Sequence, residues 1–311
     1  MSSKTTRRQF LQTVAGGAVA VGAFAQQGAG GVTATKLAEN FTLFSGAGGN
    51  VLVVGSPEGL LMVDGGLPER SGALLDAVSQ LSGSAPVRVL FNTHWHLEHT
   101  GANDRLGLAG TKIVAHENTR LWMTRDILVE WQNNKVYPAR AKEARPNDTF
   151  LVHESPKKMT FGKEQVQYGI MFEAHTDGDI YVFFPGPNIL MAGDVVAVGS
   201  YPILDYSTLG WIGGMANASR DILQIADEQT RIVPGTGPIQ TRADVQAQSD
   251  MLNTVRTRLV NMMRQGYGAK DMLAAAPTKE FDAKWGDPKQ FIMNSYSGLW
   301  GHVRELGAGI I

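Results

Sequence analysis

The chain lacks cysteine entirely, and this absence removes disulfide bonds, thiolate nucleophiles and cysteine-ligated metal sites. Histidine, aspartate and glutamate are then the side chains left to bind a metal. The 311 residues also lack a basic excess, since their formal net charge is −1, so we expect no nucleic-acid partner. With 43% hydrophobic and 18% charged residues, the composition is that of a folded chain.

The apolar run at residues 14–25 is too short, and too rich in glycine and alanine, for a comfortable membrane span. Arg7 and Arg8 precede it, and it ends in Ala-Phe-Ala, which matches an A-x-A cleavage site. Paired arginines before such a run are typical of the twin-arginine export signal of bacteria; a plain secretory signal or a short anchor is the alternative. We therefore expect residues 1–25 to be a signal peptide and the mature chain to be periplasmic, without stable membrane insertion. Cleavage removes three basic residues and no acidic one, which lowers the net charge to −4.

The rest of the chain mixes strand and helix patterns, which predicts an α/β protein with sheet inside and helices outside. Residues 26–34 are rich in Gly, Gln and Ala, and we expect a flexible lead-in there. Apolar runs at 50–54 and 60–64, separated by Ser-Pro-Glu-Gly, predict a hairpin of two buried strands. The patterns predict further strands and two helices: strands at 87–91, 113–116, 166–172, 180–184, 189–191 and 231–234, and helices at 70–81 and 219–226.

Two segments differ from this mixture. Residues 117–150 are polar with interspersed aromatics, which we interpret as helix and loop lying over a site. Residues 241–311 are helical, and Thr241 with Asp244 resembles a capping box at the start. The predicted organisation is a signal peptide at 1–25, a lead-in at 26–34, a main domain at 35–240 and a helical C-terminal extension at 241–311.

Three histidines lie within six residues, directly after the expected strand at 87–91. In an extended chain alternate side chains share a face, so His94 and His96 point the same way. Two imidazoles on one face, joined by a third from elsewhere, form the three-ligand open site that catalytic zinc favours. The alternative is a cluster of core or exposed histidines without metal. The position of this cluster, after an apolar strand and before Thr100-Gly101, favours the metal.

These residues resemble the metallo-β-lactamase superfamily, an αββα four-layer sandwich with its metal site along one edge of the two sheets. Its first motif, His-x-His-x-Asp-His followed by Thr-Gly, stands here at residues 94–101 with Glu98 in the Asp position. The other family motifs follow in the expected order: an early aspartate at Asp64, a second histidine region at His175, a bridging aspartate at Asp194, and Pro-Gly-Thr-Gly-Pro at 234–238 in place of Pro-Gly-His-Gly-Pro. The resemblance covers residues 35–240.

The resemblance implies two zinc sites that share Asp194 and otherwise have these ligands: His94, His96 and His175 in the first, Glu98 and His99 in the second. The chain departs from the family at both Glu98, which is one methylene longer than Asp, and Thr236, which replaces the last histidine. A threonine hydroxyl is a poor zinc ligand beside an imidazole, so affinity at the second site should fall sharply. We therefore expect one zinc ion, with a weak second site.

The sequence thus predicts an exported zinc-dependent hydrolase in which an activated water attacks a small-molecule ester, thioester, lactam or related substrate. Glu98 or Asp194 would accept or relay the proton of that water. One alternative is a degenerate member that binds metal or ligand without turnover, which the changes at Glu98 and Thr236 would suit. Another is redox or dioxygenase chemistry with iron in the three-histidine site. Fold does not decide the substrate.

Several other residues have two interpretations each. Asp64 either orients a motif histidine, which we favour, or is a turn residue before Gly65-Gly66. His116 is expected to be structural, and His153 and His302 to be solvated. Irregularly spaced aromatics could line a substrate pocket, although packing is the more common role: Trp122, Trp131, Tyr201, Tyr206 and Trp211.

Overall fold

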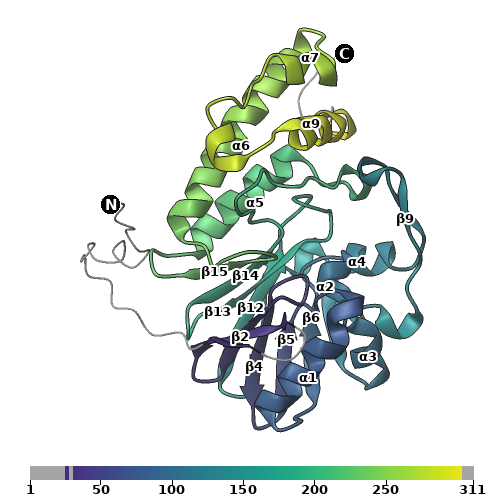
Figure 1. Ribbon diagram of the computed structural model, residues 1–311, viewed down its shortest axis with the longest axis vertical. Helices are drawn as coiled ribbons and strands as arrows, with labels where there is room; N and C mark the ends of the chain where they lie inside the picture. The colour runs from purple at the N-terminus through teal and green to yellow at the C-terminus, as the bar shows by residue number, and fades with distance from the viewer. Residues whose placement is uncertain (1–24, 28–30, 303–311) are drawn as a thin grey trace, which may run out of the picture.

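Two β-sheets packed face to face form the centre of the protein, as the computed structural model shows for residues 25–27 and 31–302 (Figure 1). The predicted signal peptide, up to residue 24, lies outside the described residues. The first sheet has the spatial order β1 (Ala25–Gln27), β2 (Thr33–Ala38), β3 (Phe41–Ser45), β4 (Val51–Ser56), β5 (Gly59–Val63), β6 (Val87–Phe91), β7 (Lys112–His116), β10 (Asp148–Phe150). The second has the order β11 (Lys157–Phe161), β12 (Glu164–Ile170), β13 (Ile180–Phe184), β14 (Ile189–Gly193), β15 (Arg231–Pro234).

The inner faces of the two sheets form one hydrophobic core. Along β13, residues alternate between buried and half-buried, and Ile180, Val182 and Phe184 point to the other sheet. Phe184 packs edge-on against Phe41 of β3, with ring centroids 5.1 Å apart. Burial of these faces holds the sheets together and fixes the register of each strand, because a one-residue slip would expose the apolar face.

Helices cover both outer faces. On the first sheet α1 (Ser71–Ser82) and α3 (Asn103–Leu108) contribute Leu74 and Leu106 to a second cluster. On the second sheet α5 (Ile212–Ile225) and α6 (Arg242–Arg264) contribute Ile222 and Leu252 to a third. The layer order is therefore α, β, β, α, which confirms the predicted sandwich. Helix α5 begins seven residues earlier than the pattern at 219–226 indicated.

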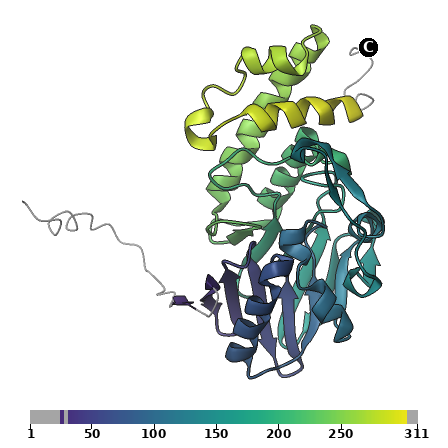
Figure 2. The same cartoon turned by 45° about the vertical axis from the view of Figure 1, so that its right-hand side comes forward.

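The helical C-terminal extension gathers at one end of the molecule (Figure 2). It contains α6, α7 (Ala269–Ala274), α8 (Asp282–Trp285) and α9 (Lys289–Gly301). The predicted capping box is present: the Asp244 amide donates to Thr241 Oγ1 at 3.3 Å, and the Thr241 amide donates to Asp244 Oδ2 at 2.9 Å. Within the described ranges, no helix combines the length and hydropathy needed to cross a membrane.

His302 ties the end of the extension to the second sheet's helical layer. Its ring stacks on Trp211 with centroids 4.3 Å apart and planes 6° apart, and its Nε2 lies 3.1 Å from Glu173 Oε2. The expectation that His302 is solvated is therefore wrong, whereas His153 is exposed as expected. Trp211 and Tyr201, which stacks on Phe291, both serve packing.

Short strands account for the main differences from the sequence-based expectations. Residues 25–27 pair with 33–35, so the lead-in at 26–34 includes strand at both ends. Residues 117–150, here called the 117–150 segment, contain helix and loop but also a hairpin and an edge strand: α4 (Glu117–Trp122), β8 (Ile127–Val129), β9 (Lys135–Tyr137) and β10. Single-turn 3-10 helices complete the elements: Pro68–Arg70, Glu130–Gln132 (η3), Lys142–Ala144, Val152–Glu154 and Tyr206–Thr208 (η6). Three-residue strands are too short to show a period of two.

His116 ends β7 and caps α4, so its role is structural as expected. Its Nδ1 accepts a hydrogen bond from the Asn118 amide at 3.3 Å, and burial lowers its pKa to about 4. An unfolded imidazole titrates near 6.5, so acid protonates the unfolded chain first, and the free energy of unfolding falls by about 3 kcal/mol as the pH drops from 6.5 to 4. We expect denaturant titrations at pH 7 and pH 4.5 to show this loss. In His116→Asn, which keeps a capping acceptor but does not titrate, the share of the loss due to His116 should disappear, while the share due to His94 and His175, whose pKa values are also lowered, should remain. An undiminished loss would contradict the assignment.

Candidate metal centre

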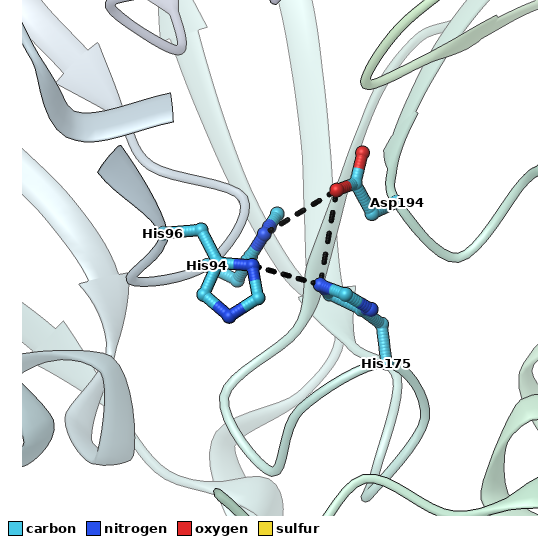
Figure 3. A group of neighbouring side chains, drawn as sticks. All are labelled: His94, His96, His175 and Asp194. Atoms are coloured by element: carbon cyan, nitrogen blue, oxygen red, sulfur yellow. Dashed lines mark hydrogen bonds and ion pairs between the residues drawn. The ribbon is translucent and has the colours of Figure 1, made fainter. Parts of the chain in front are cut away.

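Four side chains converge at one edge of the sandwich, each from a loop that follows a strand (Figure 3). His94 and His96 come directly after β6, where the chain leaves the sheet before α2 (Leu97–Thr100). His175 lies in the turn after β12, and Asp194 immediately follows β14. Strands β6, β12 and β14 end at the same edge, which brings residues 100 positions apart within reach of one another.

The potential ligand atoms form a compact group. His96 Nδ1 lies 3.1 Å from His175 Nε2. Asp194 Oδ2 lies 3.8 Å from His94 Nε2 and 3.7 Å from His175 Nε2. Among the described residues, all four ligand atoms lie within 4.8 Å of one another. Ligands of a tetrahedral zinc ion, at about 2.0–2.1 Å from the metal, are roughly 3.3 Å apart, so the group has the size that such an ion requires.

The first two histidines of the group are held by groups at the back of their rings. His94 Nδ1 lies 3.2 Å from the Thr93 hydroxyl, which leaves Nε2 facing the centre. His96 is turned the other way: its Nε2 hydrogen-bonds to Asp205 Oδ2 at 3.1 Å, and Nδ1 faces the centre. Metal-binding imidazoles are usually oriented in this manner, because a partner on one nitrogen fixes the lone pair of the other.

His175 and His99 follow the same arrangement. His175 Nδ1 lies 2.8 Å from the carbonyl oxygen of Ile203, and its Nε2 points inward. His99 Nδ1 lies 2.8 Å from Asp64 Oδ2, and its Nε2 lies 3.4 Å from Asp194 Oδ1. His94, His96 and His175 therefore present one ring nitrogen each to a common point, and His99 presents its Nε2 to the other side of Asp194.

Asp64 orients a motif histidine, which is the interpretation favoured from the sequence. Its fully buried carboxylate accepts from the Thr93 amide at 2.8 Å and the Thr93 hydroxyl at 2.9 Å, besides contacting His99. The residue has a φ of +66°, in the left-handed region. The Asp64 carboxylate thus holds both Thr93, which precedes the first motif histidine, and His99, the last one.

Asp205 holds the ring of His96, a role that the sequence did not reveal. Besides His96, its buried carboxylate accepts from the indole of Trp131 at 2.9 Å and the hydroxyl of Thr208 at 2.8 Å. Asp205 precedes η6 and belongs to none of the family motifs, so no motif spacing could have indicated it. Trp131 belongs to the 117–150 segment, which is therefore tied directly to a centre residue.

The charges around the rings separate them into two kinds. Burial, with the neighbouring imidazoles, holds the pKa of His94 well below its ordinary value and lowers that of His175, so both rings are neutral and offer a lone pair. Burial opposes the charged form of His96 and His99 too, yet the carboxylates of Asp205 and Asp64 outweigh it and raise the pKa of each. A metal must displace a proton from these two rings, so metal affinity should fall in acid.

Two observations show that the residues fit a metal. Within the described part of the chain, His94 Nε2 is a fully buried nitrogen without a hydrogen-bond partner. Burying an unpartnered polar atom costs free energy, and a cation at the convergence point removes that cost. Three imidazoles and a carboxylate are also a donor set that suits zinc and other first-row metals.

A second group of potential ligands shares Asp194 and adds Glu98 and His99, whose ligand atoms also lie within 4.8 Å of one another. The structure thus brings the half-buried Glu98 carboxylate to this centre. Thr236 does not join it: its side chain is exposed and lines a separate cavity of about 570 Å³. Gly235 beside it has no room for a side chain, because a Cβ there would lie 1.9 Å from Asp194 Oδ1.

The comparisons with known proteins agree with this geometry. A family model described as "Metallo-beta-lactamase superfamily" matches residues 45–236. The chain belongs to this superfamily. Its members are mostly metal-dependent hydrolases, and the His/Asp group described above is a group that can hold a metal. A search of curated proteins gives no significant match.

Solved structures show the same fold in other superfamily proteins. The stereoselective inverting sec-alkylsulfatase of Pseudomonas sp. aligns with a TM-score of 0.68 and 14% identity over 87% of this chain and 50% of that enzyme. This chain therefore spans half the length of the sulfatase. A metallo-beta-lactamase from Pontibacter korlensis aligns with a TM-score of 0.54 and 18% identity over 75% of this chain and 99% of that protein. At these identities, the likeness concerns the fold.

Proposed function

We propose that the protein is a zinc-dependent hydrolase of small molecules, with one zinc ion held by His94, His96 and His175 and a fourth position, beside Asp194, left for water. The observation that supports this most is the convergence of three imidazoles, each with one nitrogen fixed by a protein group and the other facing a shared point. Zinc in such a site acts as a Lewis acid and lowers the pKa of water towards neutrality. The remaining requirement is a group that takes the proton.

Glu98 is the better proton acceptor of the two candidate carboxylates. Burial opposes ionisation of Asp194, but the positive charge of nearby His99 outweighs it and holds the pKa of Asp194 below its ordinary range. Asp194 therefore stays ionised, as a carboxylate beside the ion and not as the proton acceptor. Glu98 lies close to Asp194, is half-buried, and is not a member of the first ligand group. Its carboxylate oxygen is therefore placed to accept and return a proton.

Metal analysis and a substrate panel test this function together. We expect the purified mature protein to hold about one zinc ion per chain and to hydrolyse at least one member of a panel of esters, thioesters, lactams and a secondary alkyl sulfate. Protein produced without added zinc should be assayed for iron, which separates the redox alternative. Absence of tightly bound metal would end the proposal, and about two tight ions per chain would overturn only the one-zinc part.

Thr236→His discriminates between a working one-zinc enzyme and a degenerate binding protein. Histidine extends further than threonine and would restore the donor that the family motif places with Glu98, His99 and Asp194, so we expect a second zinc ion to bind with a clearly higher affinity than in the natural chain. In a one-zinc enzyme the rate should change little. Activity that appears only in Thr236→His would favour the degenerate alternative, and Thr236→Val is the matched control for loss of the hydroxyl.

The proposed site of action is the periplasm, reached by the twin-arginine route. This rests on Arg7 and Arg8 ahead of the apolar run at residues 14–25. Replacement of both arginines by lysine keeps the charge but removes the motif, and we expect the protein to stay in the cytoplasm in fractionated cells. Unchanged export of this variant would contradict the route.

A further inference from the structure

A cavity of about 230 Å³ lies between the loop that carries His94 and His96 and the 117–150 segment. Its walls come mainly from apolar and aromatic side chains, among them Trp95, Leu97, Ile127 and Pro138, and include one ion pair, Asp104 with Arg140. Ile127 and Met123 belong to a small hydrophobic cluster with Trp95 that is separate from the three main clusters. The 117–150 segment therefore does not simply pack on the histidine loop, but leaves a space beside it.

Two walls of this cavity are chain neighbours of the metal ligands. Trp95 lies between His94 and His96, and its ring meets the ring of His96 edge-on with centroids 4.3 Å apart. Leu97, which is half-buried, lies between His96 and Glu98. In addition, Trp95 Nε1 donates to the hydroxyl of Thr208 at 3.2 Å, the same hydroxyl that donates to Asp205. A group in this cavity would contact the two side chains that flank His96 in the chain, with the Trp95 ring between it and the His96 ring.

The cavity is suited to an uncharged group. Its only ionic side chains satisfy each other, since Arg140 Nη2 lies 2.7 Å from Asp104 Oδ2 and Nη1 donates to the Thr100 hydroxyl at 3.2 Å. An ionic ligand would have to break this pair, at a cost in desolvation. An apolar cavity of about 150 Å³ holds benzene, so 230 Å³ has room for a bicyclic aryl group or an alkyl chain of roughly six to eight carbons.

We propose that this cavity receives the uncharged aryl or alkyl part of the substrate whose polar end reacts at the metal centre. The inference rests on the proposed hydrolase function, and it narrows the substrate to molecules that join a hydrolysable polar group to an apolar group of this size. The 117–150 segment then contributes the specificity of the reaction, while the strand-end loops contribute the chemistry.

Binding of 2-naphthol, an uncharged bicyclic probe, tests the cavity without any turnover. Calorimetric titration should give one site per chain and a negative change in heat capacity, the sign of apolar burial. Ile127→Phe fills the cavity from its buried wall and should weaken binding at least tenfold. Pro138→Phe partly closes it from the exposed rim, where folding is less at risk, and should weaken binding as well. Leu128→Phe is the matched control, because Leu128 is half exposed and is not among the lining residues.

The second arm asks whether the cavity serves the substrate. With p-nitrophenyl butyrate as substrate, 2-naphthol should inhibit competitively, with an inhibition constant that equals its dissociation constant and rises in Ile127→Phe but not in Leu128→Phe. Lack of binding by the natural chain, or binding that both filling variants leave intact, overturns the cavity as a ligand site. Non-competitive inhibition overturns its role in substrate binding. If 2-naphthol binds, and binds more weakly only in the two filling variants, but no substrate is hydrolysed, the hydrolase proposal is contradicted while the ligand site is supported.

Discussion

Replacing His175 with alanine is expected to abolish tight metal binding and to lower hydrolysis by a factor of about 10³ or more. His175 supplies the imidazole that comes from the second sheet, and its Nε2 lies 3.1 Å from His96 Nδ1 and 3.7 Å from Asp194 Oδ2. Without it, the two ligands that remain, His94 and His96, come from one loop and leave one side of the ion unbound. A Lewis-acid metal contributes several kcal/mol to such reactions, and each 1.4 kcal/mol is about a factor of ten in rate.

The measurement is zinc per chain after exhaustive dialysis, followed by initial rates on the best substrate of the panel. His153→Ala is the matched control, because His153 is exposed and lies outside the centre. We expect this control to retain both metal and rate. A His175→Ala protein that keeps one zinc ion and near-normal turnover would show that the three imidazoles do not act on a common ion.

Local patterns were sufficient for the centre of the fold. The buried runs at 50–54 and 60–64 predicted the hairpin of β4 and β5, and the strand at 87–91 predicted the position of the first two histidines. In each case the information lies in a contiguous stretch, because an apolar strand followed by a polar loop is visible in the sequence. His175 and Asp194 required the order of the family motifs, since nothing in the chain near them specifies a shared ion.

Residues whose role depends on distant partners could not be predicted. Asp205 resembles an ordinary turn residue until the fold places it against His96 and Trp131. His302 has no motif around it, and its burial depends on stacking against Trp211 across 91 positions. Strands β8 and β9 of the 117–150 segment pack on Trp95, a partner far away in the chain, so their three-residue patterns were not informative.

Asp205→Asn should weaken zinc binding by about 10- to 100-fold, the range typical for groups that orient a metal-bound histidine. Both carboxylate oxygens are in use: Oδ2 pairs with His96 Nε2, and Oδ1 accepts from the Trp131 indole. An amide offers only one acceptor oxygen, so at least one of these buried donors must lose its partner. If the contact with His96 Nε2 is the one lost, the ring is free to turn and its Nδ1 lone pair no longer faces the centre. Trp131→Phe removes one donor and leaves the His96 contact, so its effect should be smaller.

Zinc affinity measured by competition with a chromophoric chelator gives the primary readout, and the absorption spectrum of the cobalt-substituted protein reports on ligand geometry. A merely structural role for Asp205 would lower the unfolding midpoint of the metal-free protein without changing that spectrum. Asp287→Asn, which alters an exposed carboxylate far from the motif residues in sequence, is the control. The zinc affinities should rank natural chain, then Trp131→Phe, then Asp205→Asn, because each step removes more of the support behind His96. Equal zinc affinities in all three proteins would mean that the contact of His96 Nε2 with Asp205 does not affect how His96 Nδ1 binds the metal.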